Sequence, residues 1–495
     1  MKCCEFLVEE EEDKLRDECG VVGIYLNPPK QGEPEKKEYV AYSASDFNAA
    51  TQAYYALYAL QHRGQDSVGI AVSNGEDISI HKAMGTTAEV FKPENLEALK
   101  GNIACGHVRY ATAGSATLEN AQPLLLKSKL GAVAVAHNGQ LVNYEQLREM
   151  LEDSGSTFSS TSDTEVILKL IAKSHKKGLE RALTDTIQMI KGSFALVVST
   201  EKCLIGARDP NGIRPLCLGK VENGWILASE TCAIDSVNGT YVRDIQPGEI
   251  VIINEDGVLS FEFGERTSKR TCVFEYVYFA RPDSIIDGIP VTEAREKMGA
   301  CLARESGVPA DVVIGVPDSG IGAAQGYAKE AGIPYASGII KNKYIGRTFI
   351  APTQRERENM VFVKLNAVKS VVDGKRVVVI DDSIVRGTTS RRLVQILRRA
   401  GAKEVHFRIS SPPVKFPCYF GINTPTRGEL ISSIHNEEEI CKEIGADSLA
   451  FISAEGMLDA CRECNPEQYG FCKGCFTGEY PISVPGELSG KKISD

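Results

Sequence analysis

A cysteine at the junction between an acidic and an apolar stretch is the first residue with evident chemistry. Cys19 follows Asp17-Glu18 and precedes Gly20–Ile24. A free α-amine, with a pKa of about 7.7–8.0, can take the thiol proton of its own residue at neutral pH without a histidine, but only if that cysteine comes first in the chain. We therefore predict that residues 1–18 form a propeptide that is removed. The alternative is a buried structural cysteine at a strand start.

Two adjacent carboxylates mark a second reactive region. The apolar run Val377–Ile380 precedes Asp381 and Asp382, a loop of glycine and hydroxyl residues, and a helical pattern over Arg391–Ala400 that stops at Gly401. Carboxylates at the C-terminal end of a parallel strand can hold ribose hydroxyls or Mg²⁺, and a loop at a helix N-terminus can bind phosphate. The pattern predicts a sugar-phosphate site. The alternative is a plain strand-to-helix turn with capping residues.

Two other phosphate-binding patterns are disfavoured. Gly320–Gly326 has the spacing G-x-G-x-x-x-G, which is one residue longer than the dinucleotide fingerprint. The sequence contains no G-x-x-x-x-G-K-[ST] loop. Neither a dinucleotide-binding domain nor a P-loop is therefore expected.

Composition limits the class of protein. The 495 residues suffice for two or three domains, and 43% hydrophobic with 25% charged residues is typical of a soluble globular protein. The net charge of -10 argues against general nucleic-acid binding, which needs a basic face. No apolar run approaches the roughly 20 residues that cross a bilayer, so we expect no membrane partner. The acidic N-terminus resembles neither a secretory signal nor a transit peptide, which predicts a cytoplasmic location.

The cysteines form clusters. Fifteen cysteines are many for a cytoplasmic chain, and clustered cysteines in a reducing compartment suggest metal binding or catalysis. The pairs Cys461/Cys464 and Cys472/Cys475 could form a four-cysteine zinc site, although the separation of the pairs is shorter than in a zinc ribbon.

The elements that must position these residues differ between the two parts of the chain. The first part is predicted to be β-rich, with strands near Ala132–Ala136, Phe194–Val198 and Ile250–Ile253 and helices near Ala49–Gln61 and Thr164–His175. Ser162–Glu165 fits a helix capping box. In the second part, the apolar runs Val312–Val316, Val377–Ile380 and Val405–Ser410 alternate with helical patterns, which indicates buried parallel strands.

A polar stretch within Val258–Arg270 predicts the domain boundary. We expect domains at 19–260 and 261–495, the second ending in a polar tail from Ser483.

Five motifs of the first part occur in a specific order. They are Cys19–Gly23, Gln61–Ser67, Gly106–Thr112, His137–Gly139 and Ser162–Glu165. Together they resemble the N-terminal-nucleophile (class II) glutamine amidotransferases.

Three motifs of the second part resemble type I phosphoribosyltransferases. Val377–Ser390 is similar to their phosphoribosylpyrophosphate-binding motif, Val316–Gly320 to their pyrophosphate loop, and Lys343–Thr348 to the mobile loop that closes over substrate. The combination, from Cys19 to about Pro481, resembles the glutamine phosphoribosylpyrophosphate amidotransferase family.

This resemblance implies a fold and an activity. The fold is an α+β N-terminal-nucleophile domain, with stacked antiparallel sheets between helices, followed by an α/β type I phosphoribosyltransferase domain with a mainly parallel sheet. The implied reaction converts glutamine, phosphoribosylpyrophosphate and water to 5-phospho-β-ribosylamine, glutamate and pyrophosphate, the first step of de novo purine synthesis. The family also implies Mg²⁺, feedback inhibition by purine nucleotides and a homotetramer.

The same resemblance implies roles for individual residues. Cys19 is the nucleophile, Asn138 and Gly139 form the oxyanion hole, and Arg63, Arg109 and Asp163 bind glutamine. The phosphoribosylpyrophosphate contacts are Asp318, Ser319, Gly320, Lys343, Tyr344, Arg347, Asp381, Asp382, Arg386, Gly387, Thr388, Thr389 and Ser390, with Ser319, Asp381 and Asp382 also near Mg²⁺.

Some of these residues have simpler alternatives. Asn138-Gly139 is a strong type I′ turn signal, which is compatible with presenting hydrogen-bond donors. Arg109 could form a surface ion pair, and Asp163 could cap a helix. His62, His107 and His137 are expected to hold loops rather than to act as the base, because the family's base is the α-amine.

A leader peptide and four cysteines resemble an iron–sulfur subgroup of the family. Its [4Fe–4S] ligands match Cys272, Cys418, Cys472 and Cys475. Cys461 and Cys464 are additional, and they leave open which pair holds the metal. A structural or oxygen-sensing role is expected, because no step of the reaction transfers electrons.

Two other functions remain as alternatives. Another class II amidotransferase, such as an asparagine or glucosamine-6-phosphate synthase, would carry an ATP-activation loop or a sugar-isomerase pattern in its second domain. A phosphoribosyltransferase-like regulator would carry a DNA-binding segment, and the sequence has no basic arm.

Overall fold

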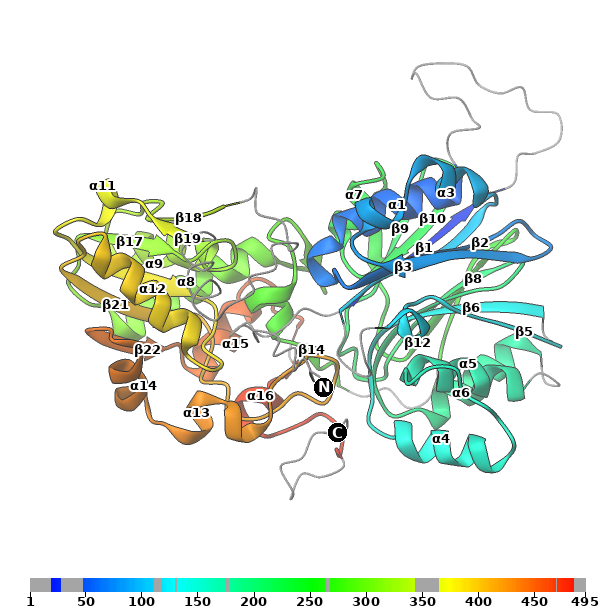
Figure 1. Cartoon of the computed structure of the whole chain (residues 1–495). Coiled ribbons are helices and arrows are strands. Elements are labelled where there is room, and N and C mark those ends of the chain that lie inside the picture. The colour runs from blue at the N-terminus through cyan, green and yellow to red at the C-terminus, as the bar shows by residue number, and fades with distance from the viewer. Residues whose placement is uncertain are drawn as a thin grey trace, which may run out of the picture.

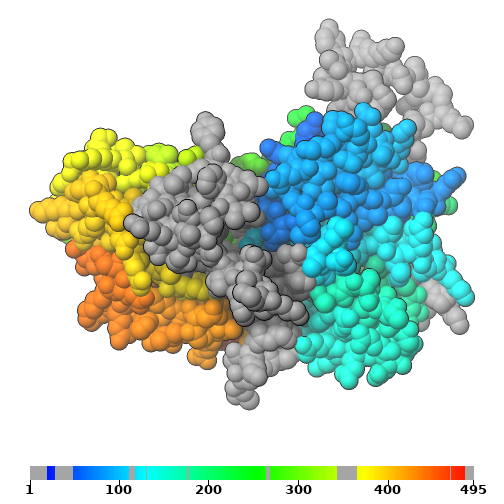
Figure 2. Space-filling view, in the orientation of Figure 1, coloured from blue at the N-terminus to red at the C-terminus, as the bar shows by residue number. Residues whose placement is uncertain are grey.

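The structure, a computed structural model, describes residues 19–27, 48–110, 117–129, 131–174, 178–263, 268–342, 365–468 and 470–484. The predicted propeptide 1–18 and three predicted substrate contacts, Lys343, Tyr344 and Arg347, lie outside these ranges. Two bodies lie side by side (Figure 1): an N-terminal half up to residue 263 and a C-terminal half from residue 268. The space-filling view shows the same division, between blue-to-cyan and yellow-to-orange surfaces (Figure 2).

Two antiparallel sheets form the centre of the N-terminal half. The first has seven strands in the order β11 (Thr240–Asp244), β9 (Cys217–Val221), β10 (Gly224–Ala228), β1 (Gly20–Leu26), β4 (Ile103–Arg109), β2 (Ser67–Ser73) and β3 (Ile78–Met84). The second has six strands in the order β13 (Gly257–Glu262), β12 (Glu249–Asn254), β8 (Leu204–Arg208), β7 (Gly192–Ser199), β6 (Gly131–Leu141) and β5 (Leu124–Ser128).

Helices cover the outer face of each sheet (Figure 1). The first sheet carries α1 (Ala49–Ala59), α2 (Thr87–Val90), α3 (Pro93–Ala98) and α7 (Thr231–Asp235), and the second carries α4 (Tyr144–Asp153), α5 (Asp163–Lys173) and α6 (Leu179–Met189). Short 3₁₀ turns occur at η1 (Gln61–Arg63) and η2 (Leu118–Asn120). This helix–sheet–sheet–helix arrangement confirms the predicted fold of the first domain.

The burial of β1 explains how Cys19 is fixed. Every residue of β1 is buried, because alternate side chains enter different cores. Val22 and Ile24 belong to the core that includes α1, whereas Val21 and Tyr25 belong to the core between the two sheets. The strand that follows Cys19 is therefore held on both faces.

A four-stranded parallel sheet forms the centre of the C-terminal half. Its order is β17 (Val312–Gly315), β20 (Arg376–Asp381), β21 (Glu404–Ile409) and β22 (Ser448–Phe451). Among its described residues, this half has the helices α8 (Val291–Ser306), α9 (Gly320–Ala331), α11 (Lys369–Val372), α12 (Thr388–Arg399), α13 (Ile431–Ile434), α14 (Glu437–Ile444), α15 (Ala454–Arg462) and α16 (Gly474–Thr477). The parallel sheet confirms the predicted fold class of this half.

Small elements complete the C-terminal half. Two-stranded pairs join β14 (Thr271–Cys272) to β23 (Phe471–Cys472), β15 (Ile285–Ile286) to β16 (Ile289–Pro290), and β18 (Ile339–Lys341) to β19 (Leu365–Ala367). A π-helical turn, η4 (Glu275–Phe279), and a 3₁₀ turn, η5 (Arg427–Glu429), lie between them in sequence. Across the described ranges, no helix combines the length and apolar character that a membrane crossing requires.

The predicted elements are largely confirmed, with differences at their ends. Thr388, Thr389 and Ser390 form the first turn of α12 rather than a loop before the helix. The turn alternative for Asn138-Gly139 is wrong, because both residues lie within β6. The strand β13 runs to Glu262, so the predicted boundary after residue 260 falls inside a strand. The exact domain limits stay a prediction.

The predicted cap of α5 is confirmed in part. The Ser162 hydroxyl accepts a hydrogen bond from the N–H of Thr164. The Glu165 carboxylate accepts from the N–H groups of Ser159 and Ser160 instead of completing a reciprocal capping box. The cap fixes the position of Asp163, the first residue of the helix.

Candidate functional site

Cys19 lies directly before β1, beside the end of β4, where Gly20 pairs with Val108. The residue is 8% exposed, and its Sγ lies 3.7 Å from the carbonyl oxygen of Tyr110. Burial raises the pKa of the Cys19 thiol, although the positive charge of Arg109 and the hydrogen bond to Tyr110 oppose this rise. The thiol therefore needs a base to become a nucleophile at neutral pH.

Arg109 ends β4 next to the nucleophile and is 3% exposed. The Gln61–Ser67 motif lies against it, since the N–H of Asp66 donates to the Arg109 carbonyl at 3.0 Å. A Cβ on Gly64 would lie only 2.6 Å from the Arg109 carbonyl carbon, so this close approach requires glycine. The motif thus fixes the end of β4 that carries Arg109. Because the Arg109 side chain is buried, the alternative of a surface ion pair is excluded.

The register of β6 directs the N–H of Gly139 away from β7. Phe194 is the β7 partner of Gly139. On the side away from β6, its carbonyl accepts from the N–H of Asp209 and its N–H donates to the Asp209 carboxylate. Gly139 is therefore in a non-hydrogen-bonded pair, and its N–H points to the opposite edge of β6. On that edge, the N–H of His137 donates to Gln122 and that of Leu141 donates to Asp163.

Asn138 carries a donor that the fold leaves unsatisfied. The residue is 1% exposed, and its Nδ2 has no hydrogen-bond partner among the described residues. A buried unpaired donor is costly, so such groups are rare in folded proteins without a functional reason. The N–H of Gly139 is a second donor on the next residue, and donors of this kind are what a developing oxyanion requires.

Asp163 contributes a buried negative charge near Cys19. Its Oδ2 accepts from the N–H of Leu141 at 3.0 Å, and its Oδ1 lies 3.5 Å from Nδ1 of His137. Burial alone would raise the pKa of the Asp163 carboxyl, but His137 and the backbone N–H groups of Leu141 and Thr164 outweigh it and hold the pKa below its usual value. An ionised carboxylate suits the binding of an α-ammonium group. The capping position of α5 is held by Ser162, and Asp163 is the first residue of the helix.

The histidines make structural contacts, although only His62 lies in a turn, while His107 and His137 lie in strands β4 and β6. His62 contacts Glu230 at 2.7 Å and the carbonyl of Ala59 at 3.2 Å, and His107 contacts the carbonyl of His137 at 3.1 Å. Burial lowers the pKa of His107 to about 3, so its ring is neutral. Within the described ranges, no histidine contacts the thiol of Cys19.

Arg63 lies at the interface between the two halves. Its guanidinium contacts Glu230 at 3.0 Å and Glu275 at 2.5 Å, and all three side chains are fully buried. These contacts commit Arg63 to the interface, and its predicted contact with glutamine stays a prediction. Glu230 and Glu275 were not anticipated from the sequence, because each is an isolated acid outside any motif.

The carboxylates of the second site meet a serine from the neighbouring strand-to-helix loop. The strands β17 and β20 are adjacent and parallel, so their carboxyl ends share one edge of the sheet. Ser319 Oγ donates to Asp382 Oδ2 at 2.5 Å, and Asp381 Oδ1 accepts from the N–H of Asp382 at 3.0 Å. The structure thus brings together Ser319, Asp381 and Asp382, as expected.

Two helices begin at this same edge. The helix α9 starts at Gly320 and α12 at Thr388, so both N-termini face the carboxylates. A Cβ on Gly320 would lie 2.5 Å from the Ile380 carbonyl oxygen, which ties the first turn of α9 to β20. Helix N-termini bind phosphate through free N–H groups and the helix dipole. The edge therefore combines anion-binding and cation-binding groups, as a phosphorylated sugar with Mg²⁺ requires.

The remaining predicted contacts lie around this edge. Asp318 accepts from Lys341 Nζ at 3.0 Å, and Arg386 contacts Glu429 at 3.1 Å. Arg295 was missed, because a single arginine in a helical pattern reads as surface. It is 3% exposed, and its guanidinium donates to carbonyls of η4 and of Ala280 while its charge acts on Asp382.

The four predicted cluster ligands, Cys272, Cys418, Cys472 and Cys475, lie in the C-terminal half. Cys272 and Cys472 are register partners in the parallel pair β14–β23. Burial raises the pKa of the Cys272 and Cys475 thiols, and Cys418 and Cys472 add to the rise in both. Cys418 and Cys472 therefore each lie close enough to Cys272 and to Cys475 to act on their thiols. Burial and then the neighbouring Cys464 raise the pKa of the Cys461 thiol, and none of the other four cysteines contributes to this rise, so the zinc arrangement is disfavoured.

Within the described residues, no three or more His, Cys, Asp or Glu side chains are placed so that they could together hold one metal ion. A [4Fe–4S] cluster has a different requirement, because its four cysteine sulfurs bind four separate iron atoms. Mg²⁺ also differs, since proteins usually hold it through one or two carboxylates and substrate phosphates. The four cysteines would supply the thiolates that a [4Fe–4S] cluster needs, and Asp381 with Asp382 would supply the carboxylates that Mg²⁺ needs.

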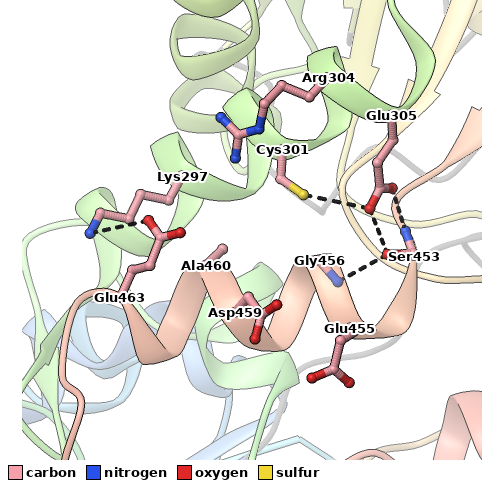
Figure 3. Close-up of a pocket in the computed structure, with 10 residues that line it drawn as sticks. All are labelled: Lys297, Cys301, Arg304, Glu305, Ser453, Glu455, Gly456, Asp459, Ala460 and Glu463. Carbon is pink, nitrogen blue, oxygen red and sulfur yellow. Dashed lines mark hydrogen bonds and ion pairs between the residues drawn. The ribbon is translucent and has the colours of Figure 1, made fainter.

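A polar pocket of about 300 Å³ lies between α8 and α15 (Figure 3). Lys297 contacts Glu463 at 3.7 Å, and Glu305 accepts from the N–H and hydroxyl of Ser453. Burial and the neighbouring Glu305 raise the pKa of the Cys301 thiol to about 11, which leaves it unreactive at neutral pH. No predicted site residue lines this pocket, and its contacts join α8 to α15.

Comparisons with known proteins agree with the two sites. Residues 107–236 match the family model of a glutamine amidotransferase domain, and residues 302–410 match that of a phosphoribosyl transferase domain. The chain is 50% identical to the amidophosphoribosyltransferase of Bacillus subtilis over 472 residues, which is 95% of each chain. It is 51% identical to that of Archaeoglobus fulgidus, covering 95% of this chain and 99% of the relative.

A solved structure gives the same result. The glutamine phosphoribosylpyrophosphate amidotransferase of Bacillus subtilis, complexed with ADP and GMP, superposes with a TM-score of 0.86 at 49% identity and covers 94% of this chain and 98% of that one. The identity and coverage extend through both halves and both sites. The chain belongs to the amidophosphoribosyltransferase family.

Proposed function

We propose that this protein transfers the amide nitrogen of glutamine to phosphoribosylpyrophosphate. The products are 5-phospho-β-ribosylamine, glutamate and pyrophosphate, which is the first step of purine biosynthesis. The observation that carries the proposal is the presence of both sites in one chain. Cys19 lies beside Arg109 and Asp163 in one half, and Asp381 with Asp382 faces two helix N-termini in the other.

In the glutaminase half, Cys19 Sγ attacks the side-chain amide of glutamine. The N–H of Gly139 and Nδ2 of Asn138 stabilise the oxyanion, with a single donor typically contributing about 3–4 kcal/mol to lowering the barrier. Arg109 holds the α-carboxylate through charge-assisted hydrogen bonds, and Asp163 holds the α-ammonium. The tetrahedral intermediate collapses to a thioester as its C–N bond breaks and ammonia leaves, and water then hydrolyses the thioester to free glutamate and the Cys19 thiol.

The base for Cys19 is its own α-amine after removal of residues 1–18. Two observations support this assignment. Burial raises the pKa of the thiol, so a proton acceptor is needed, and no described histidine contacts the sulfur. The α-amine of a first residue is tethered to that sulfur and has a suitable pKa of about 7.7–8.0.

In the synthase half, ammonia reaches C1 of phosphoribosylpyrophosphate from the glutaminase half and displaces pyrophosphate with inversion. The N-termini of α9 and α12 bind the phosphates, and the carboxylates of Asp381 and Asp382 orient the ribose. Ser319, Asp381 and Asp382 would hold Mg²⁺, which when bound neutralises charge on the leaving pyrophosphate. Asp318, Arg386, Lys343, Tyr344 and Arg347 are the proposed outer contacts.

Four cysteines are the proposed ligands of a [4Fe–4S] cluster. Cys272, Cys418, Cys472 and Cys475 come from three separate segments of the C-terminal half and approach one another there. Bound there, the cluster would tie these segments together and would be open to oxidation. Cys461 and Cys464 are not part of this proposal.

Regulation by nucleotides is proposed from a relative, and assembly is proposed from the family resemblance. A relative of 49% identity was solved with ADP and GMP, which supports feedback inhibition of this protein by purine nucleotides. We also propose a cytoplasmic homotetramer. Nucleotide titration of the initial rate and sedimentation analysis test these two points.

Product analysis tests the proposed function. Purified protein is given glutamine, phosphoribosylpyrophosphate and Mg²⁺, and glutamate and pyrophosphate are measured. Wild type should form both in equal amounts, whereas Cys19→Ala should form pyrophosphate only when free ammonia replaces glutamine. Absence of pyrophosphate from the wild type in both assays would contradict the proposal. It would favour another class II amidotransferase or a ligand-binding regulator.

A further inference from the structure

A loop of the C-terminal half reaches into the glutaminase half. The carbonyl oxygen of Phe420 accepts hydrogen bonds from Ser193 Oγ at 2.8 Å and from Arg214 Nε at 2.8 Å, and Arg214 Nη2 donates to it as well. Ser193 and Arg214 are fully buried, and Phe420 is 1% exposed. A carbonyl with three donors from the other half is held firmly in place.

The next residue contacts the oxyanion strand. Gly421 has a φ of +106°, and a Cβ built on it would lie 3.2 Å from both Cα and the carbonyl carbon of Gly139. The backbones of Gly421 and Gly139 are therefore in van der Waals contact across the interface. The left-handed conformation favours glycine at position 421, and an added methyl group would press against the backbone of Gly139.

Ser193 connects the two contacts. Its Oγ donates to Phe420 and also accepts from the N–H of Gln140 at 3.2 Å, and its carbonyl oxygen lies 3.4 Å from Nε2 of His137. Residues 137 and 140 flank Asn138 and Gly139 on β6. One buried serine thus links the loop to both sides of the oxyanion pair.

The loop is anchored within its own half. The N–H of Phe420 donates to Cys418 Sγ at 3.3 Å, and the N–H of Cys418 donates to Thr424 Oγ1 at 2.8 Å. The carbonyl of Phe420 faces the glutaminase half while its N–H faces its own half. The backbone of Phe420 is therefore held by hydrogen bonds to both halves.

We propose that Phe420 and Gly421 are positioning residues for glutamine hydrolysis, and that Ser193 transmits their effect to Asn138 and Gly139. This inference rests on the proposed glutaminase activity of Cys19. Its consequence is that the oxyanion hole is complete only when the C-terminal half is docked. Glutamine hydrolysis is then confined to a protein whose ammonia-consuming half is in place.

Two variants approach this contact from opposite sides. Ser193→Ala removes the hydroxyl that bridges Phe420 and Gln140, and Gly421→Ala adds a methyl group against Gly139. Ser199→Ala is the matched control, because Ser199 is equally buried on β7 and its Oγ has no hydrogen-bond partner among the described residues. Glutamine-driven and ammonia-driven pyrophosphate release, glutamate release and the melting temperature are measured for each variant.

We expect Ser193→Ala and Gly421→Ala to lower the kcat for glutamate release by about tenfold to a hundredfold, because small displacements at a reacting centre have effects of this size. The KM for glutamine should change little, since Arg109 and Asp163 are untouched. Ammonia-driven synthesis should stay at the wild-type level in both variants, and Ser199→Ala should match the wild type throughout. The melting temperature should fall in Gly421→Ala, where the added methyl group is strained, and in Ser193→Ala, where two hydrogen bonds are lost, so retained ammonia-driven synthesis is the control for folding.

Two results would overturn the inference. One is a wild-type kcat for glutamate release in both variants. The other is an equal loss of glutamine-driven and ammonia-driven synthesis, which would indicate a general defect of folding. A wild-type protein that hydrolyses no glutamine would instead refute the proposed function itself, so the two failures are distinguishable.

Discussion

Arg63 and Glu275, from opposite halves of the chain, form an ion pair with an Nη2–Oε2 distance of 2.5 Å and no solvent exposure of either side chain. Glu230 shares the same guanidinium, and it also accepts from the hydroxyl of Ser284. The two halves are thus joined by a buried ion pair in which each charge is balanced by a residue of the other half. Such pairs are costly to break, because the remaining charge stays buried.

Replacing Arg63 should destabilise the protein strongly. Arg63→Met leaves Glu230 and Glu275 buried without this cation, and we expect a loss of about 3–5 kcal/mol in the free energy of unfolding. Denaturant titration measures it. Lys127→Met is the control, because the Lys127–Asp77 pair has side chains 62% and 55% exposed. Lys127→Met should lower the free energy of unfolding by at most about 1 kcal/mol. Equal losses of this free energy in both variants would contradict the account.

Asn138→Ala should separate catalysis from stability. The side-chain Nδ2 makes no hydrogen bond to a described residue, so its removal costs no such bond in the folded protein. We expect the kcat for glutamate release to fall about 10²–10³-fold while ammonia-driven synthesis is retained. Steady-state kinetics with both nitrogen sources measure this. A variant with full glutaminase activity would exclude Asn138 from the oxyanion hole.

Asp381→Asn should abolish synthesis from either nitrogen source. The substitution weakens the carboxylate pair that faces the helix N-termini, and we expect a loss of at least about 10²-fold in pyrophosphate release, with a raised Mg²⁺ requirement. Asp311→Asn is the control, because Asp311 pairs with Arg376 at the opposite end of the sheet. If both variants lose activity equally, the site is not at the predicted edge.

Asp244 should make stability depend on pH. Burial and the negative charge of Asp287 raise the pKa of the Asp244 carboxyl to about 6, whereas it is about 3.9 in an unfolded chain. Between these values the folded state holds a proton that the unfolded state has lost, so the free energy of unfolding falls as the pH rises through this window. The Asp244→Asn variant has no such proton.

We therefore expect the melting temperature of Asp244→Asn minus that of the wild type to be larger at about pH 7 than at about pH 4. Calorimetry or circular dichroism at both pH values measures the difference. A difference that does not change with pH would show that Asp244 titrates normally.

Single cysteine replacements should identify the cluster ligands. Cys475→Ser should lower the iron content and the visible absorbance of protein purified without oxygen, because four thiolates are required for a [4Fe–4S] cluster. Cys461→Ser should leave both unchanged, since Cys461 influences Cys464 rather than the other four cysteines. Loss of iron in the Cys461 variant would reverse the assignment.

Local sequence patterns predicted the parts of each site that lie within one segment. The run from Val377 to Ser390 contains its own strand, carboxylates and helix start, so its chemistry is visible without a partner. The buried strand that follows Cys19 is likewise predicted by its own apolar residues. Resemblance to the family added Arg109 and Asp163, which the fold places close enough to influence the pKa of Cys19.

Other features could not be predicted, because they depend on contacts between distant segments. Arg63 and Glu275 are separated by 212 positions, and Ser193 and Phe420 by 227. No local pattern marks either pair. Asn138-Gly139 shows the opposite problem: its composition favours a turn, but pairing with β7 places it within a strand. Here tertiary structure overrides local preference.

The most direct test of the central claim combines two measurements on one preparation. Mass spectrometry identifies the first residue, and glutamine with a heavy amide nitrogen is supplied with phosphoribosylpyrophosphate to follow the label. We predict a chain that begins at Cys19 and transfers the heavy nitrogen to phosphoribosylamine. Full transfer by a chain that still carries residues before Cys19 would contradict the account.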